Sequence, residues 1–96
     1  MAKQKVIRQA TVTGEDNVFE FDVVGFKFLV KNLTDGDILV ALSEDDEDSE
    51  KILIPSETAQ IVVGSEIPVL RLGTTALTVT PSTTNTTGVE IQCLVW

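Results

Sequence analysis

The chain has 96 residues, of which 43% are apolar, and its 15 acidic and 7 basic residues give a net charge of -8. This length and balance predict one small domain over residues 1–96. Such a domain has a modest core and gains from burying more surface by self-association. Histidine is absent and Cys93 is the single cysteine, which excludes Cys/His zinc sites, histidine-dependent triads and an internal disulfide. We therefore expect no cofactor and no enzymatic activity.

The negative charge is concentrated in one segment, Glu44–Glu50, in which six of seven residues are acidic. We predict this run to be a solvated loop between two strands. The excess of acids argues against nucleic-acid binding. Gly, Pro, Ser and Thr interrupt the long uncharged runs, so we expect no membrane association through a spanning helix. The basic N-terminal residues precede no apolar stretch, so we expect no secretory signal and synthesis in the cytoplasm.

In the N-terminal half, alternating apolar and charged residues predict two strands that share a buried face, over residues 19–23 and 26–31. We expect a bulge or kink between them at Gly25, because only glycine adopts a positive φ at low cost. Residues 33–37, Leu-Thr-Asp-Gly-Asp, have the composition of a tight turn that joins antiparallel strands. The next strand is predicted over residues 38–42.

In the C-terminal half, apolar runs are bounded by proline and glycine. They predict strands over residues 51–55, 58–63, 68–72, 76–80 and 89–96, with a polar loop at 81–88. No segment of helical length repeats its apolar residues at the helical period. The sequence therefore predicts an all-β protein, a single small antiparallel β-sandwich or partly closed barrel of seven to nine short strands.

Four large apolar residues fall on outward positions of the predicted strands: Leu29, Leu39, Leu94 and Trp96. On neighbouring strands they would form a patch of about 400 Å², as large as a soluble monomer usually exposes. We expect this patch to be an oligomer or docking face, and a homo-trimer is the first expectation. The alternative is that residues 5–13 fold over it as a covering strand of the same chain, because apolar residues also alternate there.

Other candidate chemistry is weaker. The acidic run could supply oxygens to Ca²⁺, but it lacks the central glycine of an EF-hand loop, so we predict no metal site. Cys93 lies on the inward face of the last strand and is predicted to be a buried apolar residue. Trp96 could stack on a sugar, or another subunit or sheet could hold it in place at the chain end.

Three segments, residues 25–42, 52–60 and 89–96, carry a resemblance to a known group of proteins. A strand ends in Lys31-Asn32 before a turn, Ile54-Pro55 follows a polar insertion, and a valine-rich strand closes the chain. This order resembles small β-sandwich proteins encoded in the structural gene clusters of tailed bacteriophages and prophages. The resemblance implies a virion component of the capsid-decoration or head-fibre type, which would occupy the host cytoplasm during assembly and dock on a capsid protein. The alternative function is a calcium- or glycan-binding β-sandwich module.

Overall fold

The computed structural model describes residues 5–41, 51–63 and 74–96. These residues form β-strands and no helix, which confirms the all-β prediction. The strands in chain order are β1 (Val6–Thr11), β2 (Asn17–Gly25), β3 (Lys27–Asn32), β4 (Ile38–Ala41), β5 (Lys51–Ile54), β6 (Thr58–Val63), β7 (Thr74–Pro81) and β8 (Asn85–Val95). The predicted acidic loop at 44–50 and the predicted strand at 68–72 lie outside the described residues.

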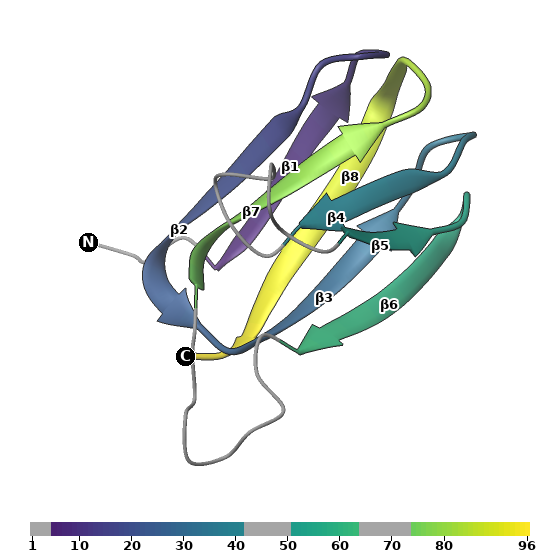
Figure 1. Cartoon of the computed structure of the whole chain (residues 1–96). Helices are drawn as coiled ribbons and strands as arrows, with labels where there is room; N and C mark the ends of the chain where they lie inside the picture. The colour runs from purple at the N-terminus through teal and green to yellow at the C-terminus, as the bar shows by residue number, and fades with distance from the viewer. Residues whose placement is uncertain (1–4, 42–50, 64–73) are drawn as a thin grey trace.

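The strands form two antiparallel sheets that pack face to face (Figure 1). The first sheet has the order β1-β8-β3-β6 and the second the order β2-β7-β4-β5. Within the described ranges, every strand-to-strand ladder joins members of the same sheet, so the fold is an open sandwich. Apart from the step from β4 to β5, each strand is followed in the chain by a strand of the opposite sheet.

Alternate side chains of both sheets point inward and fill one core. The buried cluster comprises Phe19, Phe21, Phe28, Val30, Ile38, Val40, Ile54, Val62, Leu77, Val79, Val89, Ile91 and Cys93. The rings of Phe21 and Phe28 meet across the two sheets with their centroids 5.4 Å apart. Each such side chain contributes about 1.5–3 kcal/mol by leaving water. The predicted burial of Cys93 is therefore confirmed.

Gly25 ends β2 at the point where the chain passes from the second sheet to the first. The expected positive φ is wrong, because among the described glycines only Gly14 and Gly88 have one. Glycine is required at position 25 for space. A Cβ atom there would lie 2.5 Å from Cζ of Phe28 and 2.7 Å from Sγ of Cys93. The kink is a corner between the two sheets, and the pairing of β2 with β7 also shifts register between Glu20 and Gly25, as the expected bulge requires.

The expected hairpin at residues 33–37 is also wrong, because β3 and β4 lie in different sheets. This crossing is organised by Asn32, whose side chain is fully buried. Its amide nitrogen donates to the carbonyl oxygens of Gly36, Ile54 and Pro55 at 2.9–3.1 Å. Its side-chain oxygen accepts from the backbone nitrogen and hydroxyl of Thr34. One side chain therefore ties together the β3–β4 crossing and the end of β5.

The N-terminal strand does not cover the outer face of the sandwich, as the alternative in the sequence analysis supposed. β1 pairs with β8 from Val6 to Thr11 and extends the first sheet by one strand at its edge. The polar loop expected at 81–88 is also shorter, since β7 runs through Pro81 and β8 begins at Asn85. The pairing of β1 with β8 shifts register between Gln9 and Thr11, opposite the Thr- and Gly-containing start of β8.

Candidate functional site

The four residues predicted to form one docking face do not lie together. Leu29 on β3 belongs to the first sheet and lies between the inward core residues Phe28 and Val30. Leu94 on β8 belongs to the same sheet, but it lies where the register with β3 shifts, between buried Cys93 and exposed Val95. Leu39 on β4 lies in the second sheet between Ile38 and Val40, which also point inward. Its side chain therefore faces the opposite side of the sandwich, and the prediction of a single face is wrong for Leu39. Trp96 follows the end of β8 and is exposed.

The outer face of the first sheet carries exposed apolar side chains on several strands, and we call it the docking face. Its residues, read from the strand registers and, for Ala10, from its exposure, are Val6, Arg8, Ala10, Lys27, Leu29, Lys31, Ala59, Ile61, Val63, Glu90, Gln92 and Val95. One row across all four strands runs Val6, Gln92, Leu29 and Ile61. Ile61 and Val63, which were not among the predicted face residues, alternate with buried Val62 and are 51% and 46% exposed. Val6, expected in a covering strand, also lies on this face.

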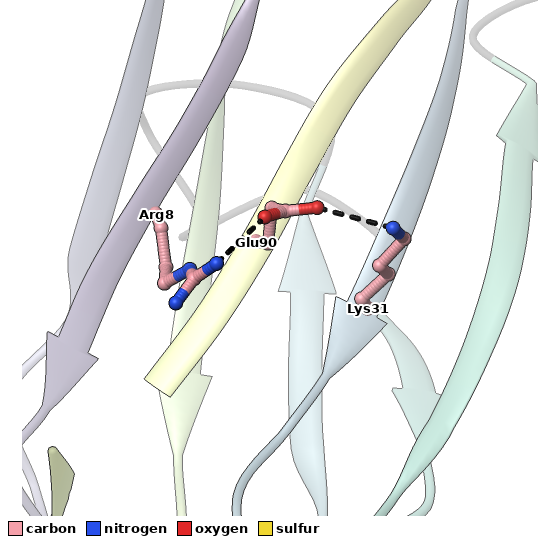
Figure 2. Close-up of polar contacts among 3 residues, drawn as sticks. All are labelled: Arg8, Lys31 and Glu90. Carbon is pink, nitrogen blue, oxygen red and sulfur yellow. Dashed lines mark hydrogen bonds and ion pairs between the residues drawn. The ribbon is translucent and has the colours of Figure 1, made fainter. Parts of the chain in front are cut away.

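A charged triad forms the next row of the docking face (Figure 2). Glu90 on β8 lies between Arg8 of β1 and Lys31 of β3, with nitrogen-to-oxygen distances of 3.3 and 3.2 Å. The three residues are directly opposite one another in the two strand registers. The hydrogen bond from Lys31, with a smaller contribution from Arg8, holds the pKa of Glu90 below its ordinary value. The triad therefore joins the three strands electrostatically from outside the core.

Replacing Glu90 with glutamine is expected to lower the free energy of unfolding by about 0.5–1 kcal/mol at neutral pH, because partly exposed ion pairs contribute little. The depressed pKa means that this stability is present above the unfolded-state value of Glu90. It is lost as the pH falls through the folded-state value. Urea melts of wild type and Glu90→Gln should therefore differ at pH 7 and converge in acid. Glu20→Gln, which replaces an exposed glutamate on β2, is the control. A difference that persists in acid contradicts the assignment.

The docking face is basic although the chain is acidic overall. It carries Arg8, Lys27 and Lys31 against Glu90 alone, a net charge of +2 in a protein of net charge -8. The outward positions of β2 in the second sheet instead include the acids Glu20 and Asp22. Interleaved cations and apolar side chains on one sheet face suit an acidic surface that also offers apolar groups.

The chain end is held against the margin of the same sheet. The Nζ atom of Lys5 lies 4.4 Å from the centroid of the Trp96 ring, a cation–π contact. The backbone nitrogen of Phe26 donates to the carbonyl oxygen of Val95, and that of Cys93 donates to Lys5. These contacts, rather than the second sheet, position Trp96. Lys5 occupies one face of the Trp96 ring, so only the other face is left for a sugar to stack on.

The described residues offer little to catalysis or metal binding. They contain no group of three or more His, Cys, Asp or Glu residues placed to hold a metal ion. Burial raises the pKa of the Cys93 thiol, which makes it a poor nucleophile. A hollow of about 370 Å³ lies beside the triad, where β3 and β6 meet the turn before β6. Its lining comprises Lys31, Asn32, Leu33, Glu57, Thr58, Ala59 and Thr87. Within the described ranges there is no helix long and apolar enough to cross a membrane.

The chain matches no protein-family model, no curated protein and no solved structure.

Proposed function

We propose that this chain is a non-enzymatic structural protein of a bacteriophage virion, of the capsid-decoration or head-fibre type, which docks on a capsid protein through its docking face. The observation that carries the proposal is that face, a sheet surface on which Val6, Leu29, Ile61 and Val63 stand among three cations. The resemblance of residues 25–42, 52–60 and 89–96 to small virion proteins supports the same conclusion.

The partner fits the chemistry of the face. An acidic patch with apolar side chains on the capsid exterior would pair with Arg8, Lys27 and Lys31 and would cover the apolar row through Leu29. Neither nucleic acid nor a membrane is part of this proposal. Calcium or glycan binding, the alternative, depends on the acidic run at 44–50, which lies outside the described residues, and on Trp96, which already contacts Lys5.

Leu29→Glu is expected to abolish binding to capsids, because it places an acid at the centre of the docking face. Leu39→Glu is the matched control: both leucines are half-buried on outward positions of inner strands, but Leu39 lies in the opposite sheet. The assay is co-sedimentation with heads purified from a deletion mutant of a phage whose genome normally carries this gene. Wild type and Leu39→Glu should sediment with the heads, and Leu29→Glu should remain in the supernatant.

Two results would count against the proposal. In one, wild-type protein fails to sediment with the heads. In the other, both glutamate variants bind as well as wild type. Thermal melts of both variants establish first that they are folded. A preliminary check is the position of the gene, which should lie between portal or major capsid genes and tail genes.

A further inference from the structure

The edge of the first sheet formed by β6 differs from the other three sheet edges. Charged side chains protect β1 (Arg8), β2 (Glu20 and Asp22) and β5 (Lys51), and Pro55 follows β5 directly. Strand β6, Thr-Ala-Gln-Ile-Val-Val, has no charged residue and no proline. Charges, prolines and bulges are the usual devices that keep sheet edges from pairing with other chains. The sequence of β6 therefore contains nothing that would prevent its edge from pairing with another strand.

The geometry of β6 points the same way. It pairs with β3 over six consecutive residue pairs, from Lys27 with Val63 to Asn32 with Thr58, without any shift of register. The edge pairings of β1 with β8 and β2 with β7 both contain a shift. On the side of β6 away from β3, no strand of the described residues pairs with it. Figure 1 shows β6 at the edge of its sheet. Within the described ranges the strand therefore presents a regular row of backbone donors and acceptors, with apolar side chains beside it.

We propose that this edge pairs with the β6 edge of a second copy of the chain, antiparallel and about a two-fold axis. An antiparallel strand pair is self-complementary, so each copy satisfies the free backbone groups of the other. Because β6 carries no charge, no like charges oppose one another across the axis. A docked peptide from another protein would satisfy one edge only, whereas the two-fold pair satisfies both.

The assembly that follows is a closed dimer in place of the expected trimer. Pairing two first sheets at β6 gives one continuous sheet, and Ile61 and Val63 of both copies lie at its centre on the outer side. The docking faces of the two copies then form a single surface. This inference depends on the β6 edge and holds whether or not the chain docks on a capsid.

Ile61→Lys is expected to weaken the dimer at least about tenfold, because the symmetry places two lysines near one another across the new strand pair. Val6→Lys is the matched control: both residues lie in the same row of the docking face, 51% and 47% exposed, on opposite edges of the sheet. Sedimentation of wild type and Val6→Lys should give a mass that rises with concentration towards twice the 10.4 kDa of one chain. Ile61→Lys should remain monomeric over that range.

Hydrogen exchange separates edge pairing from association through the faces. The backbone amides of residues 58–63 should gain protection as the protein concentration rises, while those of β1 should not. A wild-type monomer at all concentrations overturns the inference. So does a dimer whose β6 amides exchange independently of concentration, or one that Val6→Lys weakens as much as Ile61→Lys. Leu29→Glu, which tests capsid docking, should leave the dimer intact, so the two proposals fail separately.

Discussion

Asn32→Ala is expected to lower the free energy of unfolding by about 3 kcal/mol or more, a large effect for a single polar substitution. The Asn32 side chain is fully buried and serves three carbonyl oxygens and Thr34 at once. An amide group has only two N–H bonds, so one of them is shared between two of these carbonyls. Alanine leaves the partner groups buried without water to replace the lost bonds, and each such group costs about 1–3 kcal/mol.

Thermal denaturation provides the measurement, and a loss of this size corresponds to a fall in Tm of more than about 12 °C for a domain of this length. Gln60→Ala on exposed β6 is the control and should change stability by less than about 0.5 kcal/mol. If Asn32→Ala melts within a few degrees of wild type, the crossing from β3 to β4 does not depend on this side chain.

Gly88→Ala should be comparably damaging, for two reasons that act together. Gly88 has a φ of +73°, which side chains rarely adopt, and an added Cβ would overlap the backbone carbonyl of Gln9 on β1. Backbone atoms cannot turn aside as a flexible side chain can. We therefore expect β1 to separate from β8 at this point, with a loss of about 3 kcal/mol or more.

Gly14→Ala separates the cost of a positive φ from the cost of a steric overlap. Gly14 has a φ of +81°, but an added Cβ would meet no atom within 4 Å. Alanine there should cost about 1–2 kcal/mol, the penalty of the left-handed backbone alone. Urea titrations of the two variants measure the difference, and amide exchange across β1 shows whether that strand is released. Equal losses in the two variants would mean that the approach of Gln9 to Gly88 is unimportant.

The composition of the docking face could not be predicted from the sequence alone. Leu29 and Leu39 are each outward on an alternating strand, and the sequence predicts that correctly for both. Alternation states only which side of a strand is buried. In a sandwich the buried sides of both sheets enter one core, so the two leucines are outward in opposite directions. The triad of Arg8, Lys31 and Glu90 was missed for the same reason, since its members become neighbours only through the strand registers.

The sequence alone determined that this chain is all-β, where most of its described strands between Phe19 and Trp96 lie, and that alternate side chains such as Phe19, Phe28 and Cys93 fill the core. Strand-forming composition, the period of two and turn residues are properties of short segments, so they can be read without the fold. Tertiary structure decided which strands share a sheet. Gly25 is a corner because Phe28 and Cys93 pack against it, and residues 33–37 cross between sheets because Asn32 bonds to the end of β5. These choices depend on contacts between residues far apart in the chain, which a local pattern does not contain.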